Sequence, residues 1–447
     1  MLEAATNLLR RTFGHPEFRP LQERVIVPAM AGRDVLAVLP TGGGKSLCFQ
    51  VPALHGTGLT VVVSPLIALM QDQVARLSSV GVAAEMLGGD MGRSDEAAVL
   101  ARAGSGELRL LYLSPERLPR IADELNRHSI DVVRLAVDEA HCIVEWGHDF
   151  RPSYRRIRHA RLHLGRPQCI ALTASATPEV RRAIRESLGM SPTAVEVVGS
   201  FDRSNLRFEV LRANGQEDRL ARMIVLVRTT RGPAIVYAPT RGLTEGLAAA
   251  LIDCGVAAAP YHAGMAPAER RATLDGFLSD RHRVVVATCA FGMGIDKADV
   301  RLVAHWTLPS TPESYYQEAG RAGRDGRPAR CVLFHHPSDE RHPRRQLATT
   351  FPEERIVEAI WRDPSIRQRH PVHVVAAADR LEQELMPARG KVDWSGVRRR
   401  RREAERRLAA MLRYSQTRTC RRAALMGWFG ESVRRCTGCD NCRDAPR

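Results

Sequence analysis

The chain has 447 residues, of which 44% are hydrophobic, so it is long enough to fold into about three domains with buried cores. No apolar run approaches the length of a membrane span and no signal peptide is visible, which argues against membrane and exported proteins. We therefore expect a cytoplasmic protein. Its net charge of +16 favours a polyanionic partner, either nucleic acid or an anionic membrane surface.

The first segments precede a candidate nucleotide site. Residues 3–13 carry apolar side chains at helical spacing, and the sequence Phe-Arg-Pro-Leu-Gln at residues 18–22 comes before a second predicted helix. The amide of Gln22 offers a donor and an acceptor side by side, as an adenine edge requires, and Arg19 or His15 could lie against the ring. Taken alone, these residues are better explained as an ordinary helix cap and turn.

A glycine-rich loop follows a predicted buried strand at residues 35–39. Residues 39–46 read Leu-Pro-Thr-Gly-Gly-Gly-Lys-Ser, and a helix can open after them. Such a turn lets backbone N–H groups converge on an anion, and the helix N-terminus adds positive potential. Lys45 is predicted to contact the β- and γ-phosphates and Ser46 to bind Mg²⁺, although a glycine turn with a surface lysine is the alternative. The other loop residues of this site are Thr41, Gly42, Gly43 and Gly44.

Apolar strands then alternate with helices. Residues 61–63, 110–113, 135–137 and 170–172 are predicted strands, and residues 65–77 are a predicted helix. This alternation predicts a parallel sheet covered on both faces, which binds ligands at the carboxyl ends of its strands.

An acidic pair directly follows the strand at residues 135–137. Asp138 is predicted to hold Mg²⁺ through water opposite Ser46, and Glu139 to orient and deprotonate an attacking water molecule. A solvated acidic loop is the alternative, but the phosphate loop upstream argues against it.

The residues after this pair, up to Tyr154, mix aromatic and charged side chains without helical periodicity. Stacking rings beside an arginine are what single-stranded nucleic acid binding needs, whereas a core-packed loop is the alternative. The candidate residues are His141, Trp146, His148, Phe150 and Arg151.

A second α/β unit begins after residue 205. Residues 234–237, 284–287 and 302–304 are its predicted strands. Arg321 and Arg324 are predicted to lie one helical turn apart on a common face, where they could contact a γ-phosphate as an arginine finger. A basic helix face is the alternative.

The last part of the chain is rich in arginine. Residues 398–402 are five consecutive arginines that lead into a predicted helix at residues 403–412, and they either touch DNA phosphates or form a solvated face. A small helix-turn-helix is predicted around residues 371–412. Four cysteines follow with the spacing C-x15-C-x2-C-x2-C, which suits tetrahedral zinc better than disulfides. They are Cys420, Cys436, Cys439 and Cys442.

Taken in order, these motifs resemble the RecQ branch of superfamily 2 helicases over residues 6–338, and the cysteine cluster resembles the RecQ zinc-binding subdomain. The resemblance rests on residues 18–22, 41–46, 64–73, 138–141, 146–151, 172–177, 287–297 and 317–326. It implies two RecA-like lobes with ATP in the cleft between them, single-stranded DNA crossing both lobes, and movement in the 3′→5′ direction. It also implies that Gln22 and Arg19 contact adenine, that residues 146–151 couple DNA contact to hydrolysis, and that Arg324 is the foremost finger. Gly294, Asp296 and Gln317 join the nucleotide site by the same resemblance.

We therefore predict an α/β fold of two tandem RecA-like parallel-sheet lobes, at residues 1–205 and 206–340. A mostly helical, arginine-rich segment at residues 341–411 and a small four-cysteine zinc-binding module at residues 412–447 follow. Because the chain stops at residue 447, we expect a short form without winged-helix and HRDC modules, or a fragment of a longer protein.

The predicted function is an ATP-dependent 3′→5′ DNA helicase of DNA repair and recombination. Its expected cofactors are ATP, Mg²⁺ and Zn²⁺. We expect a nucleoid-associated monomer that acts on single-stranded and partially duplex DNA, with single-strand-binding or repair proteins as further partners. The open alternatives are a DNA-stimulated translocase, an annealing or remodelling factor with weak or partner-dependent unwinding, a passive zinc-dependent DNA-binding module, and an RNA helicase. The intact hydrolytic set argues against the passive module, and the loop at residues 146–151 argues against the RNA helicase.

Overall fold

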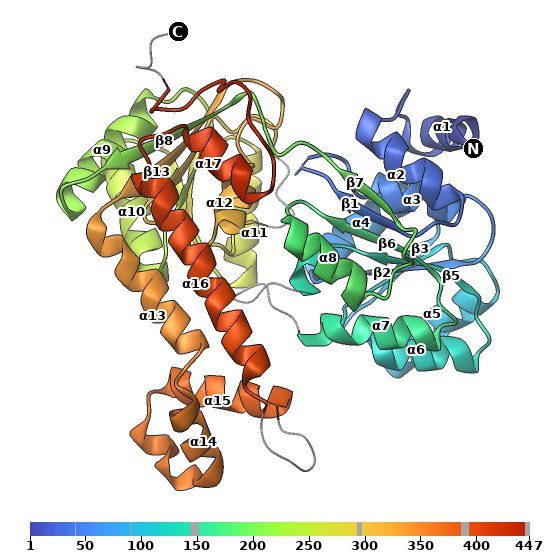
Figure 1. Cartoon of the computed structure of the whole chain (residues 1–447). Coiled ribbons are helices and arrows are strands. Elements are labelled where there is room, and N and C mark those ends of the chain that lie inside the picture. Colours follow the sequence, from blue (N-terminus) through green and yellow to red (C-terminus); the bar gives the residue numbers. More distant parts are fainter. Residues whose placement is uncertain (41, 90, 144–151, 293–296, 386–392, 443–447) are drawn as a thin grey trace. The chain divides into compact units, whose positions relative to one another are not determined.

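The computed structural model describes residues 1–40, 42–89, 91–143, 152–292, 297–385 and 393–442, which form two compact units (Figure 1). The first unit comprises Met1–Arg203 and a short later piece, Phe429–Glu431. The second comprises Ser204–Phe291, Lys297–Trp428 and the described residues from Ser432 onward. The four-part division of the chain is finer than these two units and stays a prediction.

The first unit is built on a seven-stranded sheet in the order β3-β4-β2-β5-β6-β1-β7. All of its recorded strand pairings are parallel. Its central strands are buried on both faces, as expected where helices cover a parallel sheet. The strands are β1 (Val35–Val38), β2 (Leu59–Val63), β3 (Ala84–Leu87), β4 (Leu110–Leu113), β5 (Val132–Val137), β6 (Gln168–Thr173) and β7 (Val195–Val198).

Helices cover this sheet and complete its core. Phe49 of α3 and Met70 of α4 pack in one cluster with Val35, Ala37 and Val62 of the sheet. The α-helices are α1 (Leu2–Leu8), α2 (Pro20–Met30), α3 (Leu47–Leu54), α4 (Ile67–Ser79), α5 (Arg93–Gly104), α6 (Leu118–Arg127), α7 (Ile157–His163) and α8 (Pro178–Ser187). A π-helical turn, η1 (Leu9–Phe13), and two 3-10 turns, η2 (Ala140–Ile143) and η3 (Pro152–Arg156), complete the unit.

The second unit contains a six-stranded parallel sheet in the order β10-β11-β9-β12-β13-β8. Val284 and Val286 of β11 pack with Leu247 of α10 and Val227 of α9. The strands are β8 (Leu206–Arg212), β9 (Ala234–Tyr237), β10 (Ala258–Tyr261), β11 (Val284–Ala287), β12 (Leu302–His305) and β13 (Ala329–His335). The helices within this α/β part are α9 (Gln216–Thr229), α10 (Arg241–Asp253), α11 (Pro267–Leu278) and α12 (Pro312–Ala319).

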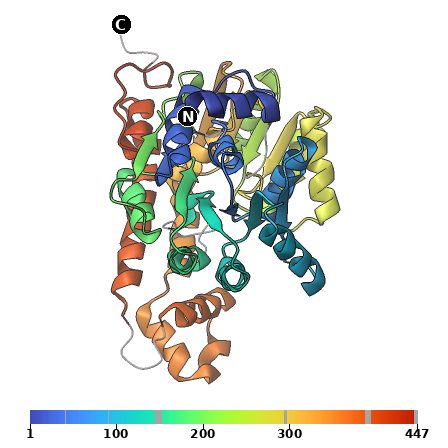
Figure 2. The ribbon, with the colours of Figure 1, turned by 90° about the vertical axis from the view of Figure 1, so that its right-hand side faces the viewer.

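A helical segment follows within the same unit. Its long helix α16 contacts α12, α13 and α17, while α14 and α15 pack together near its start (Figures 1 and 2). Trp361 stacks on Trp394 with ring centroids 5.6 Å apart and joins α14 to the start of α16. The elements are η4 (Pro337–Glu340), α13 (Arg341–Thr350), α14 (Glu354–Arg362), η5 (Pro364–Arg369), α15 (Val372–Leu385), α16 (Ser395–Gln416) and α17 (Arg421–Trp428).

The predicted fold class is confirmed: two parallel-sheet lobes, a helical segment and a cysteine cluster. Residues 110–113, 234–237 and 284–287 form strands with the predicted bounds. The strands that the sequence did not indicate include all four sheet edges, β3, β7, β10 and β8. Charged residues interrupt β3, β7 and β8, so these strands lack the continuous apolar run that was the signal used, and β10 contains Pro260, which is uncommon in strands.

Two local expectations need correction, and a third stays a prediction. Residues 3–13 do not form one α-helix, because α1 passes into the π-helical turn at Leu9 and ends at Gly14, whose φ is 71°. The arginines at 398–402 lie inside α16, which begins at Ser395 rather than at residue 403. For the predicted helix-turn-helix, α15 and α16 are present, but the residues that connect them lie outside the described part. No helix in that described part is long and apolar enough to cross a membrane.

Asp34 ties the end of the first sheet to the helices around it. Its carboxylate pairs with Arg161 of α7 at 2.9 Å and accepts backbone N–H groups of Cys169 and Ser191 at 2.7 and 2.8 Å. The Asp34 and Arg161 side chains are each only 7% exposed.

We expect Asp34→Ala to lower the free energy of unfolding of the first unit by about 3–5 kcal/mol, because it leaves a buried guanidinium without its partner. The matched control is Glu124→Ala, which removes the surface pair of Glu124 with Arg127 and should cost less than about 1 kcal/mol. Differential scanning calorimetry compares the two variants. Similar shifts for both would contradict the structural role of Asp34.

Candidate active site and zinc centre

The phosphate loop connects β1 to α3, and its three glycines are conformationally required. Gly42 and Gly44 have φ values of 80° and 72°, which side-chain-bearing residues rarely adopt. A Cβ on Gly43 would lie 2.8 Å from the carbonyl oxygen of Pro40. The backbone thus forms a cradle that any side chain would fill, and this fits the binding of a phosphate group.

Ser46 is the N-cap of α3, so the loop runs directly into a helix N-terminus. Gln22 and Arg19, predicted to contact adenine, lie against this loop. The Gln22 amide nitrogen donates to the Gly44 carbonyl at 3.1 Å, its oxygen accepts from the Arg19 N–H at 2.9 Å, and the Arg19 guanidinium donates to the Gly42 carbonyl. Their adenine contact stays a prediction.

The acidic pair follows β5 in the same sheet. Asp138 is 5% exposed, and its carboxylate accepts the N–H of Glu139 at 3.0 Å. Burial raises the pKa of Asp138 to about 6; the Glu139 charge adds to the rise and the Lys45 ammonium opposes it. Glu139 has a φ of 46°, so the chain turns sharply at this point. The sharp turn therefore directs the two adjacent carboxylates differently: Asp138 is buried, and the Glu139 side chain is 16% exposed.

The strand β6 lies between β1 and β5 and connects their loops. The Thr173 carbonyl at its end accepts the N–H of Leu39, and the Thr173 hydroxyl lies 2.8 Å from Nδ1 of His141. That nitrogen is also 3.3 Å from a carboxylate oxygen of Glu139. His141 is 2% exposed and thus links the acidic loop to the strand next to the phosphate loop.

Sequence reasoning missed the role of Tyr154. This side chain is fully buried, and its hydroxyl donates to the Asp138 carbonyl at 3.0 Å. Tyr154 thus holds the turn at Asp138 and Glu139 in place, although it lies at the end of the segment that follows this acidic pair in the sequence. No local signal distinguished it from the other aromatic residues, because the contact spans 16 positions of the chain.

The remaining predicted residues are distributed as follows. Gln317 lies on α12 of the second unit, and Arg321 and Arg324 follow that helix. The two arginines do not share a helical face: α12 ends at Ala319, and the turn after it contains Gly323 with a φ of 54°. Arg321 is 9% exposed and lies close enough to Tyr237 to oppose the rise that burial causes in the tyrosine pKa. The predicted residues Thr41, Trp146, His148, Phe150, Arg151, Gly294 and Asp296 lie outside the described part of the chain.

The four C-terminal cysteines form a metal centre. The Sγ atoms of Cys420, Cys436, Cys439 and Cys442 all lie within 4.8 Å of one another. Tetrahedral zinc with Zn–S bonds of about 2.3 Å needs sulfur atoms separated by about 3.8 Å. The cluster therefore fits zinc. Cys420 also accepts the N–H of Ala423 at 3.4 Å, which helps orient this ligand.

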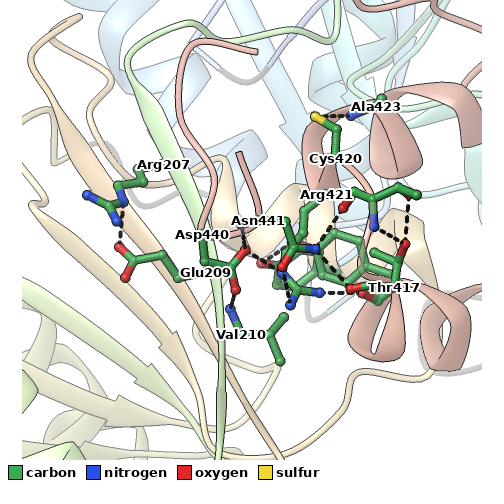
Figure 3. A network of polar contacts seen from close by, with 12 residues as sticks. Arg207, Glu209, Val210, Thr417, Cys420, Arg421, Ala423, Asp440 and Asn441 are labelled. Atoms are coloured by element: carbon green, nitrogen blue, oxygen red, sulfur yellow. Dashed lines mark hydrogen bonds and ion pairs between the residues drawn. The ribbon is translucent and has the colours of Figure 1, made fainter. Parts of the chain in front are cut away.

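Two residues near the cysteines attach the zinc module to the edge of the second sheet (Figure 3). Asp440 accepts the N–H of Val210 on β8 at 2.9 Å and pairs with the buried Arg421. Asn441 donates to the carbonyls of Thr417 and Thr419 at 2.9 and 2.7 Å. The cysteine loop is thus fixed both to β8 and to the end of α16.

Three protein families match successive parts of the chain. They are DEAD/DEAH box helicase over residues 19–184, helicase conserved C-terminal domain over residues 216–326, and RecQ zinc-binding over residues 377–443. The last match covers the four-cysteine cluster and distinguishes this chain from other helicases. The chain belongs to the RecQ family of superfamily 2 helicases.

Curated RecQ relatives match nearly the whole chain. The ATP-dependent DNA helicase RecQ of Haemophilus influenzae is 37% identical over 445 residues, which are 99% of this chain and 64% of the relative. The RecQ of Bacillus subtilis is 42% identical over 342 residues, which are 76% of this chain and 57% of the relative. This RecQ-family chain thus spans less than two thirds of these relatives. The predicted cofactors ATP, Mg²⁺ and Zn²⁺ are confirmed by the family matches and the cysteine cluster.

The fold has parallels among solved structures. The Mycobacterium smegmatis helicase Lhr bound to single-stranded DNA and AMP-PNP is similar with a TM-score of 0.58 and 24% identity, over 75% of this chain and 48% of that one. At this identity the likeness shows the fold alone.

Gly44→Ala should weaken nucleotide binding, because alanine is strained at a φ of 72° and its Cβ, 2.3 Å from the Gln22 amide nitrogen, would displace that side chain from the phosphate loop. The control is Gly14→Ala, where φ is 71° but nothing lies within 4 Å. Both variants carry similar backbone strain, but only Gly44→Ala changes the phosphate loop and displaces Gln22. Titration with a fluorescent ATP analogue measures the binding. Wild-type affinity in Gly44→Ala would contradict the proposed loop geometry.

Cys439→Ser should lower the metal content from about one zinc per chain and reduce the melting temperature. The control is Cys254→Ser, which changes an exposed cysteine outside the cluster and should retain the zinc. Elemental analysis by mass spectrometry reports the zinc, and thermal unfolding reports the stability. A folded, metal-free wild-type preparation would refute the assignment.

Proposed function

We propose that this chain is an ATP-dependent DNA helicase that translocates 3′→5′ on single-stranded DNA and separates duplex strands, in DNA repair and recombination. The observation that carries the proposal is the grouping of a phosphate loop and an acidic pair at the carboxyl ends of neighbouring strands in the first sheet, in a chain that also has a four-cysteine module. The identity to curated DNA helicases supports DNA as the polyanion that the charge of +16 favours.

Each residue then has a chemical role. Lys45 and the loop N–H groups would hold the β- and γ-phosphates, while Ser46 and Asp138 would hold Mg²⁺. Glu139 would orient the attacking water and accept its proton. Bound Mg²⁺ would supply charge neutralisation at the phosphates.

The second unit would supply Gln317, Arg321 and Arg324 to the nucleotide, with Arg324 as the foremost finger residue. The contact between His141 and Thr173 offers a route by which the loop after the acidic pair could influence the phosphate loop. We infer that DNA bound at residues 146–151 promotes hydrolysis through this contact, and that the resulting lobe movement drives stepping.

Single-stranded and partially duplex DNA are the proposed substrates, and single-strand-binding or repair proteins are proposed partners of a monomeric enzyme. The match to bacterial DNA helicases supports DNA as the substrate, and an enzyme that acts on bacterial DNA would lie at the nucleoid.

Strand displacement on a 3′-tailed DNA duplex with ATP tests the proposal. We expect the wild type to displace the strand of the 3′-tailed duplex and to displace little from a 5′-tailed duplex. Lys45→Ala should slow the ATPase by about 100-fold or more but retain DNA binding, because this residue acts on the phosphates alone. The control Arg93→Ala changes an exposed cation at the start of α5 and should be active.

Three results would change the conclusion. ATPase activity stimulated by single-stranded DNA without displacement would indicate a translocase, annealing or remodelling factor. Stronger stimulation by RNA than by DNA would indicate an RNA helicase. Unchanged turnover in Lys45→Ala would refute the phosphate-loop assignment.

A further inference from the structure

The second unit contains an open groove of about 1130 Å³ between its sheet and the zinc module. The groove lies where β8, β12 and β13 begin and where α9 ends, beside the backbone of residues 435–439. The Phe208 N–H donates to the Gly438 carbonyl at 3.3 Å, and the Asp440 N–H donates to the Phe208 carbonyl at 3.1 Å. The zinc module thus runs alongside the edge strand β8 and forms one wall of the groove.

Among the described residues that line this groove are five arginines and no aspartate or glutamate. The arginines are Arg207, Arg231, Arg301, Arg330 and Arg435. A groove with cationic walls and no carboxylate in them attracts anions, since the positive potentials of its walls add.

Three of these arginines are held in place by carboxylates behind the groove wall. Arg207 and Arg330 both contact Glu209, at 3.1 and 2.8 Å, and Figure 3 shows the Arg207–Glu209 pair near Asp440. Arg301 pairs with Asp325. In the described part of the chain, Glu209 thus orients two of these guanidinium groups and Asp325 orients the third.

The other two arginines extend the cationic surface into solvent. Arg231 follows α9 and Arg435 directly precedes a zinc ligand, and both are exposed. In the described part of the chain, neither side chain has a recorded hydrogen bond or ion pair. The two arginines belong to different segments of the chain but line the same groove, where their guanidinium groups are available to bind a ligand.

The chemistry of the wall selects the ligand. Guanidinium groups bind phosphate oxygens in a planar, bidentate manner. The lining residues that the structure describes include no Phe, Tyr or Trp, so they offer no ring on which an unpaired base could stack. A duplex presents its phosphates outward and keeps its bases inside, and therefore matches a wall of this kind better than a single strand does.

We propose that this groove binds the sugar–phosphate backbone of duplex DNA. This inference deepens the proposed function and rests on it, because it names a contact for the double-stranded arm of a partially duplex substrate. The groove uses none of the residues assigned to the nucleotide or to the zinc ion except the lining cysteines. Sequence-independent holding of the duplex would follow from phosphate contacts alone.

The test is the double variant Arg231→Glu/Arg435→Glu. Its matched control is Arg271→Glu/Arg281→Glu, which reverses the charge of two exposed arginines of the same unit outside the groove. Fluorescence anisotropy measures binding of a blunt DNA duplex, without nucleotide, at several salt concentrations. We expect about tenfold weaker binding in the groove variant and a salt dependence reduced by about two phosphate contacts, but near wild-type values in the control.

Two further measurements keep the result interpretable. Single-stranded DNA should stimulate the ATPase of the groove variant as much as that of the wild type. If single-stranded DNA does not stimulate the wild-type ATPase, the proposed function is refuted, but the duplex-binding measurement still stands. The zinc content shows whether Arg435→Glu disturbs its neighbouring ligand. If zinc is lost, Arg231→Glu alone carries the test, with an expected weakening of about threefold.

The proposal is overturned if duplex affinity and its salt dependence stay within twofold of the wild type, or if the control loses as much. It is equally overturned if a polyglutamate peptide binds the wild type and not the groove variant while duplex binding is unchanged. That last result would assign the groove to an acidic protein partner.

Discussion

The parallel arrangement of the first sheet is the constraint on which the candidate active site depends. Because β1, β6 and β5 are neighbouring parallel strands, the loops that follow them lie together at the carboxyl ends of these strands. Adjacent strands lie about 4.8 Å apart, so one intervening strand separates the two loops by roughly 10 Å. That spacing leaves room for a phosphate group and a metal ion between the glycine cradle after β1 and Asp138 after β5.

The strand between the two loops does more than set their distance. Thr173 at the end of β6 contacts Leu39 before the phosphate loop and His141 behind the acidic pair. Tyr154 anchors the same acidic turn through the Asp138 carbonyl. The site is therefore supported by hydrogen bonds among segments that are distant in the sequence. A movement of His141 or Tyr154 would shift the positions of the two carboxylates.

The zinc module is attached to the edge of the second sheet through an isolated backbone bridge between Cys439 and Phe208 of β8. Its backbone runs beside β8, and the buried Arg422 donates to the Leu206 carbonyl and lies over the Phe208 ring, with its guanidinium carbon 5.4 Å from the ring centroid. Zinc that orders the four cysteines would also order the segment from Arg435 to Asp440. The metal centre thus shapes one wall of the arginine-lined groove, which joins a structural role to the proposed role in DNA binding.

The sequence by itself determined the chemistry and the general architecture. Apolar runs predicted the buried strands, residues Gly42–Ser46 predicted the phosphate loop, and cysteine spacing predicted the metal centre. Each of these signals is local in the sequence. Three edge strands were missed because charged residues interrupt their apolar runs, and β10 was missed because it contains a proline. Arg321 and Arg324 were wrongly placed on one helix because the chain turns after Ala319, where Gly323 has a positive φ.

Only the tertiary structure decided which residues support the site and which form a surface. Gln22 lies against the phosphate loop, Tyr154 lies under the acidic turn, and Arg231 comes onto the same groove as Arg435, 204 positions later in the chain. Such contacts join residues through the packing of the sheet, and no local pattern of residue types records them. The physical reason is that propensity and residue spacing act within a few residues of the chain. A binding surface, in contrast, forms when burial of the core brings distant segments together.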